Sequence, residues 1–577
     1  MNEIPSLYQL VERLRHDLLH VSLPAFAPEL AICATIIVML LLRIPRLGAR
    51  LNSFWVAMPG TAVALVLSGP WHYLLPTPAD LELPTYKLLG SPIFDGMLVY
   101  DELSVFFRSL LLLFALLFLF FTRISGIPDR EDSADFYTLI LGGILGMCIM
   151  ASANHMLTVF LGVEMASVPS YALAGILKGR RTAGEAAIKY AVYGAGAAGV
   201  MLYGISLLAG ALGTMHLPTM AAQLADMSSE TFADRRLVLM GGSLMVAVGL
   251  AFKLSAVPFH FWAPDVFEGA CAEVGAFLSV ASKAAALALL LRVTLGITHV
   301  PHDHAHAPTP HASAVAPSAS PSAGPVRFAS TKAEVPHASS HAEAGPKPLD
   351  SVRTFIARLL ALLAAITCTF GNLAAYGQTN IKRLLAYSTI AHAGYMLMPA
   401  AAAVAMAGTN PEGARGAVAA ICIYAGTYLF MNLGAFAIVA FLRNTLRSEQ
   451  IADYAGLIKR SPGIVILFST ILLSLVGLPP LAGFIGKFVA FGALVEAQML
   501  TLLIIGGLNT AISLFYYLRV VRTMALDPEP ADRTSVDFTL LSAEGVYSTL
   551  VTVPVLVLGL FWDQLNQLAQ AAAGRLF

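Results

Sequence analysis

Long hydrophobic stretches, separated by short polar segments, follow one another along most of this 577-residue chain. A helix that crosses a membrane needs about 20 mainly apolar residues. About fourteen stretches approach that length, counting broken ones, and we expect each to be helical. They lie near residues 29–43, 52–70, 101–122, 134–153, 156–177, 184–210, 236–262, 272–297, 355–376, 381–403, 416–442, 462–495, 498–524 and 547–566. The pattern predicts an all-α polytopic membrane protein.

The composition agrees with a chain whose main solvent is lipid. Hydrophobic residues make up 57% of the chain and charged residues only 12%, whereas soluble domains carry roughly 25% charged residues. The formal net charge is zero, so nothing indicates nucleic-acid binding. The five cysteines are scattered without a C-x-x-C pair, and we therefore expect no cysteine-ligated metal or cluster.

The short loops indicate an orientation, because Lys and Arg concentrate in cytoplasmic loops of membrane proteins. Basic residues follow the first, fifth, eleventh and thirteenth stretches and open the tenth. Counting alternately, all these loops fall on one side, which we expect to be the cytoplasm. Both termini then face outward.

One segment, from His299 to about Asp350, has a different character. It is rich in Pro, Ala, Ser and His and has no helical periodicity, so it cannot bury enough apolar surface to fold by itself. We interpret it as a disordered outward-facing loop between two halves of the chain. His302, His304 and His306 alternate along it and could bind Zn²⁺ or Ni²⁺ weakly, but a solvated linker is the simpler interpretation.

Most charges lie in the predicted loops, and we expect four to lie inside the membrane: Glu164, Lys253, Lys283 and Lys487. An ionisable group at membrane depth is costly unless it is paired or hydrated. A static ion pair of Glu164 with Lys253 would explain two of them. Three lysines cannot all be neutralised by one glutamate, however, so we interpret the set as a proton relay.

Two of these lysines lie beside helix breakers. Pro258 follows Lys253 by five residues, and Pro479 and Pro480 precede Lys487. Broken helices in corresponding positions of two halves are typical of transport sites. We therefore expect breaks in the seventh and twelfth spans. Spans four to eight and nine to thirteen would form two five-helix sets of opposite topology.

Three further residues are weaker candidates for the relay. His260 follows the first break and His392 lies in LLAYSTIAHAGYMLM; each is either a relay group or a hydrogen-bonded core histidine. Lys189 is closer to a loop and could simply extend its amine to the membrane surface. The glycine-rich pieces GGILG and GAGAAG lie inside hydrophobic stretches, where they favour close helix packing rather than phosphate binding.

Four motifs, in order, resemble the NuoN family, subunit N of bacterial NADH–quinone oxidoreductase (respiratory complex I). They are FLGVEMASVPSYALAGILKGRRTAGEAAIKYAVYGA, GLAFKLSAVPFHFWAPDVFEGA, NLAAYGQTNIKRLLAYSTIAHAGYML and LSLVGLPPLAGFIGKF. The resemblance spans about Tyr137 to Arg522 without the His-rich insert. It implies the antiporter-like fold of fourteen transmembrane helices, with two inverted five-helix repeats and broken helices 7 and 12.

The resemblance also implies a division of the chain and roles for its buried charges. Glu164 matches the glutamate of helix 5, Lys253 the lysine of broken helix 7, Lys283 the linking lysine of helix 8 and Lys487 the exit-side lysine of helix 12; Lys189 and His260 also match positions held in NuoN-like chains. The expected units are residues 1–130 with helices 1–3, 131–298 with the first repeat, 299–352 with the His-rich loop, 353–525 with the second repeat, and 526–577 with the C-terminal loop and helix 14.

By this resemblance the chain is expected to translocate protons in the membrane arm and to contain no redox centre. NADH, FMN, iron–sulfur clusters and quinone are then handled by partner subunits. The implied partners are M- and L-like antiporter subunits, small membrane subunits and lipid, in a bacterial inner membrane with both termini in the periplasm. A subunit of a related cation/proton antiporter or membrane-bound hydrogenase complex is an alternative. Another is a scaffold whose charges only hold helices together.

One motif departs from the family pattern. The usual sequence before helix 8 resembles GAPAPVTAF, whereas Gly269 to Phe277 here read GACAEVGAF. The lost prolines put the shape of this loop in doubt. The change also introduces Glu273, a charge near the expected cytoplasmic side of the relay.

Overall fold

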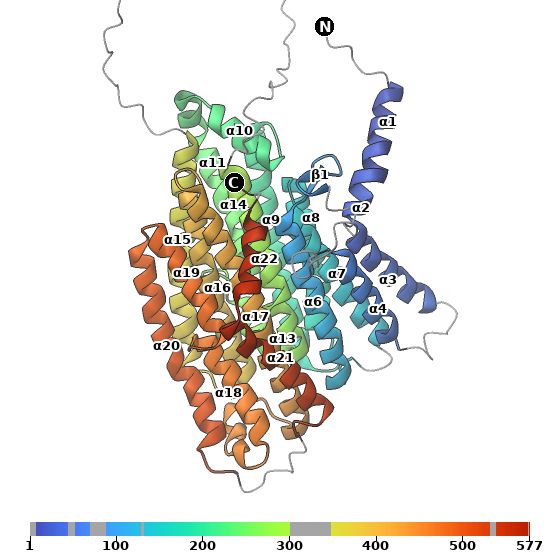
Figure 1. Ribbon diagram of the computed structural model, residues 1–577, viewed down its shortest axis with the longest axis vertical. Coiled ribbons are helices and arrows are strands. Elements are labelled where there is room, and N and C mark those ends of the chain that lie inside the picture. Colours follow the sequence, from blue (N-terminus) through green and yellow to red (C-terminus); the bar gives the residue numbers. More distant parts are fainter. Residues whose placement is uncertain are drawn as a thin grey trace, which may run out of the picture.

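The computed structural model describes residues 7–43, 52–69, 88–128, 132–299, 348–530, 538–574 and 576. Most helices run roughly along one axis and pack into an elongated bundle (Figure 1). A small antiparallel hairpin, β1 (Ser91–Ile93) and β2 (Leu98–Tyr100), precedes α6. The α-helices of the bundle are α1 (Leu7–Asp17), α2 (Leu23–Ala25), α3 (Ala27–Arg43), α4 (Phe54–Leu67), α6 (Glu102–Ser125), α7 (Ser133–Ser152), α8 (Met156–Ala174), α9 (Arg181–Leu212), α10 (Leu217–Asp226), α11 (Ser229–Leu254), α12 (Trp262–Gly269), α13 (Ala272–Ser279), α14 (Ala281–Thr298), α15 (Pro348–Ala375), α16 (Ile381–Met406), α17 (Pro411–Leu446), α18 (Pro462–Val476), α19 (Ala482–Glu496), α20 (Leu500–Ala525), α21 (Ala543–Leu560) and α22 (Asp563–Ala573).

A helix occupies each predicted stretch, but fewer than fourteen are long enough to cross a membrane alone. Among the described residues, eleven helices have the required length and hydropathy, or twelve if a pair bent by 77° at Ala25–Ala27 is one span. The difference arises from short helices. α4 has 14 residues, and α18 and α19 have 15 each. The count of fourteen full spans therefore stays a prediction.

The N-terminal helix continues through Leu23-Pro24, although the residue before a proline disfavours the helical conformation. A π-turn at Leu18–Ser22 leads directly into α2, which contains Pro24. α3 begins at Ala27 with Pro28 as its second residue. Proline is compatible with the first turn of a helix, because the amide hydrogen that it lacks has no partner there. Both prolines therefore start helical segments, and the chain bends at Phe26.

The breaks in the seventh and twelfth stretches lie where the prolines predict them. α11 ends at Leu254 and α12 begins at Trp262, while α18 ends at Val476 and α19 begins at Ala482. The residue that follows the first helix of each broken pair has a left-handed backbone conformation, with φ of 55° at Ser255 and 92° at Gly477. A left-handed residue commonly ends a helix. The two breaks therefore have the same local design.

The most buried helices form the centre of the bundle. Every residue in the most apolar 18-residue stretch of Ala272–Thr298, which includes α13 and α14, is buried. In the corresponding stretches of α16 and α17, 94% of the residues are buried. The share falls to 33% for α15 and α20, which lie side by side at one edge of the bundle (Figure 1). Side chains of α14 and α16 are thus enclosed by protein. Much of α15 and α20 faces outward.

Candidate functional site

The three predicted lysines lie inside the protein, on three different helices. Lys253 is in the last turn of α11, Lys283 in the first turn of α14 and Lys487 in α19. Their exposed fractions are 4%, 2% and 4%. Within the described part of the chain, none of the three forms an ion pair with a carboxylate. They are buried cations or amines without a direct counterion.

Two of the lysines bind equivalent backbone carbonyls at the helix breaks. Lys283 Nζ donates a hydrogen bond of 2.6 Å to the carbonyl oxygen of Leu254, the last residue of α11. Lys487 Nζ donates one of 2.8 Å to the carbonyl oxygen of Val476, the last residue of α18. Carbonyls at the end of a helix have no intrahelical partner and carry the negative end of the helix dipole. Each break thus supplies a partial negative charge to one lysine.

Glu164 and Lys253 do not form the static ion pair that was one sequence-based explanation for them. Glu164 is half-buried on α8, and its Oε1 is buried with no hydrogen-bond partner among the residues that the structure describes. The amine of Lys253 lies 6.0 Å from the centre of the Tyr171 ring. Both ionisable groups are therefore left with unused hydrogen-bonding capacity.

His392 lies in a buried hydroxyl network between the central helices. Its Nδ1 is 2.8 Å from the Tyr424 hydroxyl and its Nε2 is 3.5 Å from the Tyr517 hydroxyl, which in turn hydrogen-bonds Ser388. The histidine ring is 5.9 Å from that of Tyr395, centre to centre. These groups can pass a proton along hydrogen bonds, since hydroxyls and imidazole both donate and accept.

Lys487 lies beside this network and contacts Tyr395. Its amine lies 4.3 Å from the centre of the Tyr395 ring, within the range of a cation–π contact. The Tyr395 hydroxyl is 3.4 Å from Asn372 Nδ2 and 3.3 Å from Thr510 Oγ1. The structure thus brings His392 and Lys487 to the same ring.

His260 and Lys189 lie apart from this network. His260 follows the break after α11, where its ring packs 4.4 Å from that of Phe370 and its Nδ1 has no partner among the described residues. Lys189 binds Glu185 and Asp265, each at 2.8 Å.

Asp265 joins Lys189 to the second half of the chain, because it also accepts a hydrogen bond of 2.9 Å from Arg383 of α16. Burial raises the pKa of Asp265, but the hydrogen bonds and charges of Lys189 and Arg383 outweigh it and hold this pKa below its usual value. Asp265 is therefore an ionised link between α9, α12 and α16.

The expectation that only four charged residues lie inside the spans was wrong. Glu29 and Arg108 are both buried and form an ion pair of 2.8 Å. Arg292 of α14 is also buried and forms a two-point ion pair with Asp101, which caps α6. Both arginines lie within apolar runs, VFFRSLLLL and ALLLRVTL, and this position could have indicated from the sequence that they are buried. Both pairs are neutralised locally, unlike the three lysines.

Two further buried charges lie where the two halves of the chain meet. Lys382 binds the Ala270 carbonyl oxygen at 2.7 Å and Glu449 at 2.9 Å. Glu273 is fully buried; its Oε1 is 3.4 Å from Arg443, and its Oε2 has no hydrogen-bond partner among the described residues. Glu273 therefore connects α13 to α17.

No group of three or more His, Cys, Asp or Glu side chains that could hold a metal ion occurs among the described residues. His302, His304 and His306 lie outside them, so their weak metal site stays a prediction.

Residues 153–306 and 346–513 match the family model described as NADH:quinone oxidoreductase/Mrp antiporter, transmembrane. The chain belongs to this family. Its relatives include NADH-quinone oxidoreductase subunit N of Anaeromyxobacter sp. (strain Fw109-5), 36% identical over 562 residues that cover 95% of this chain and 96% of that protein. Subunit N 2 of Sorangium cellulosum (strain So ce56) is 36% identical and covers 94% and 95%. These relatives confirm the subunit N resemblance that the four motifs indicated.

Solved structures of the family share the fold. A chain of respiratory complex I from Thermus thermophilus, solved with bound aureothin, has a TM-score of 0.64 and 28% identity, and the match covers 93% of this chain and 98% of that one. A chain of the Mrp complex from Dietzia sp. DQ12-45-1b has a TM-score of 0.72, with coverage of 96% and 98%. The latter is only 17% identical, so it bears on the fold alone.

Proposed function

We propose that this chain is a proton-translocating subunit of the membrane arm of NADH–quinone oxidoreductase. The observation that carries the proposal is the set of three buried lysines that have no carboxylate partner in the described part of the chain, two of them bound to the open carbonyl ends of broken helices. A permanent ammonium without a counterion is costly in such a place, whereas a neutral amine is tolerated. Groups of this kind can gain and lose a proton when their surroundings change.

In the proposed pathway, Glu164 responds to a neighbouring subunit and alters the proton affinity of Lys253. The proton then passes to Lys283 and through bridging water. The hydroxyl network of His392 carries it to Lys487 and outward. Moving one charge against 100 mV requires about 2.3 kcal/mol. A change in the distance between Glu164 and Lys253 in a medium of low dielectric can supply energy of that order.

The equivalent breaks support two inverted repeats as the frame of this pathway. α11 and α12 flank one left-handed residue and its proline, and α18 and α19 flank the other. In each case the carbonyl oxygen of the last residue of the first helix accepts a hydrogen bond from a lysine amine. Transporters built from inverted repeats place their sites at such discontinuous helices.

The redox reaction belongs, in this proposal, to partner subunits that hold NADH, FMN, iron–sulfur clusters and quinone. M- and L-like subunits and small membrane subunits would adjoin this chain in a bacterial inner membrane, with both termini in the periplasm. Lys189, His260 and Asp265 would lie at the cytoplasmic side of the pathway.

The test is substitution of Lys283 or Lys487 by Met in the assembled complex, reconstituted in liposomes. We expect NADH oxidation to continue while the number of protons moved per NADH falls, because methionine keeps the side-chain volume but cannot carry a proton. Lys459→Met is the matched control, since Lys459 is an exposed loop residue. A normal proton ratio in a fully assembled Lys487→Met complex would refute the relay. Impaired assembly with an intact ratio would favour the scaffold alternative.

A further inference from the structure

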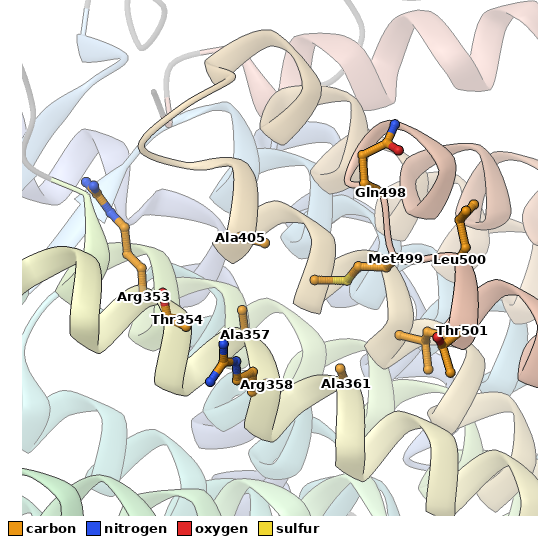
Figure 2. Close-up of a pocket in the computed structure, with 11 residues that line it drawn as sticks. Arg353, Thr354, Ala357, Arg358, Ala361, Ala405, Gln498, Met499, Leu500 and Thr501 are labelled. Atoms are coloured by element: carbon orange, nitrogen blue, oxygen red, sulfur yellow. The ribbon is translucent and has the colours of Figure 1, made fainter. Parts of the chain in front are cut away.

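A hollow of about 400 Å³ opens on the surface between α15, α16 and the start of α20. Figure 2 shows Arg353 and Arg358 on successive turns of α15, across the hollow from Met499 and Leu500. Ala357 and Ala361 form its floor on α15, and small side chains there leave the space unfilled. The hollow therefore combines two arginines with an apolar lining.

The two arginines differ in how many hydrogen-bond and ion-pair partners they have within the described part of the chain. Arg353 donates to the carbonyl oxygen of Thr298 at 2.7 Å and to Asp350 at 2.9 Å, so part of its charge is neutralised. Arg358 is exposed and has no hydrogen-bond or ion-pair partner among the described residues. Its guanidinium is free to bind an anion, and its planar fork suits two oxygens of a phosphate.

Two rows of exposed apolar side chains lead away from the hollow along neighbouring helices. α15 and α20 run in the same direction and are joined by hydrogen bonds from Asn509 to Thr369 at 3.0 Å and from Tyr376 to the Ile512 carbonyl at 2.9 Å. Residues four apart on a helix lie on one face. On α15, the row continues from Arg358 through Leu362, Ile366 and Phe370. On α20, the row consists of Leu500, Ile504 and Leu508.

From this arrangement we propose that the hollow binds the headgroup of an anionic phospholipid, with its acyl chains lying along the rows of α15 and α20. The anion satisfies Arg358, and the chains cover side chains that are 41% to 62% exposed. Basic pockets between transmembrane helices recognise anionic lipid headgroups on the cytoplasmic side of membranes, and the pairing of arginine with phosphate that we propose here is the same. The ligand must be both anionic at one end and apolar along its length, which a free phosphate is not.

A helix from a neighbouring subunit is the competing occupant. Such a helix is about 10 Å across and would have to bring an acidic side chain to Arg358. The two arginines that line the hollow favour a phosphate-bearing headgroup over a mainly apolar helix. The site does not depend on the proton pathway, so the two proposals can fail separately.

The test measures lipid bound to the purified, delipidated complex by native mass spectrometry during titration with palmitoyl-oleoyl phosphatidylglycerol. Phosphatidylcholine with the same chains is the headgroup control. We expect Arg358→Gln to weaken retention of one phosphatidylglycerol about fivefold, which corresponds to roughly 1 kcal/mol for one basic residue near an anionic surface. Arg358→Lys should retain most of the binding, because the charge remains.

Two more variants separate the pocket from general charge effects. Ala361→Phe fills the hollow without changing charge and should also lower phosphatidylglycerol retention. Arg447→Gln removes an exposed arginine at the end of α17 farthest from the hollow and should leave it unchanged. Equal retention by wild type and Arg358→Gln would overturn the proposal. So would equal binding of both lipids, or a structure of the complex with a protein helix in the hollow.

Discussion

Gly483 lies at a close contact between the two halves of the second broken helix. It lies in the first turn of α19, and a Cβ atom added to it would stand 1.8 Å from the carbonyl oxygen of Ser474 in the last turn of α18. Cβ atoms essentially never approach another atom closer than 3.0 Å. Both atoms are fixed to backbone, so no side-chain rotation can relieve the overlap. Gly483→Ala must therefore push the two helix halves apart by at least 1.2 Å, the difference between 3.0 and 1.8 Å.

That displacement acts on the hydrogen bond of Lys487. The bond joins the last turn of α18 to the second turn of α19 and measures 2.8 Å, so a separation of 1.2 Å along it exceeds hydrogen-bonding distance. Overpacking costs about 1–3 kcal/mol, and a lost hydrogen bond to a charged group about 1.5–3 kcal/mol. The gain from replacing glycine by alanine in a helix is only about 0.5–1 kcal/mol. We expect net destabilisation of a few kcal/mol and a lower proton yield.

The assay compares Gly483→Ala with Gly492→Ala in the same helix. Apart from its chain neighbours and its own helix backbone, a Cβ at Gly492 would meet no atom of the described residues within 4 Å. This control therefore keeps the packing of α19 and changes only the helix propensity of the residue. Both complexes are reconstituted, and the thermal midpoint of unfolding and the ratio of protons to NADH are measured. If Gly483→Ala matched Gly492→Ala in both quantities, the proposed link between helix packing and Lys487 would be refuted.

Two further predictions concern charges outside the lysine set. Arg292→Met leaves Asp101 buried without its partner and should destabilise the complex by about 3–5 kcal/mol; the double variant with Asp101→Asn should recover much of this loss in a thermal denaturation series, and no recovery would contradict the pairing. The pKa of Asp265 is lowered in the folded chain, so its ion pairs stabilise the fold at neutral pH. This stability is fully present above the unfolded pKa of about 3.9. It disappears as the pH falls through the lower pKa of the folded chain. Thermal midpoints measured between neutral and acidic pH should therefore fall more steeply for the wild type than for Asp265→Asn, with parallel curves counting against the link.

Properties that depend on neighbouring residues in the chain could be predicted from the sequence. Apolar length located the helices, and the prolines located both breaks. Burial of Lys253, Lys283 and Lys487 followed from their apolar flanks. Short helices such as α4 made the number of full spans uncertain.

Contacts between distant parts of the chain could not be predicted. Arg292 and Asp101 are 191 residues apart, and Lys283 reaches a carbonyl 29 residues before it. No local pattern encodes which helix packs against which, so the absence of a Glu164–Lys253 pair and the neutralisation of Arg108 by Glu29 emerged only in three dimensions. The hydroxyl network around His392 likewise combines α16, α17 and α20.

The contact between a lysine amine and a helix-ending carbonyl has a mechanical meaning as well as an electrical one. A charged donor forms a shorter and stronger hydrogen bond than a neutral one. In the proposed relay, departure of a proton from Lys487 would therefore loosen the joint between α18 and α19, and its return would tighten that joint. The seam would open and close in step with turnover, so amide exchange rates near Gly477 should follow the enzyme's working cycle.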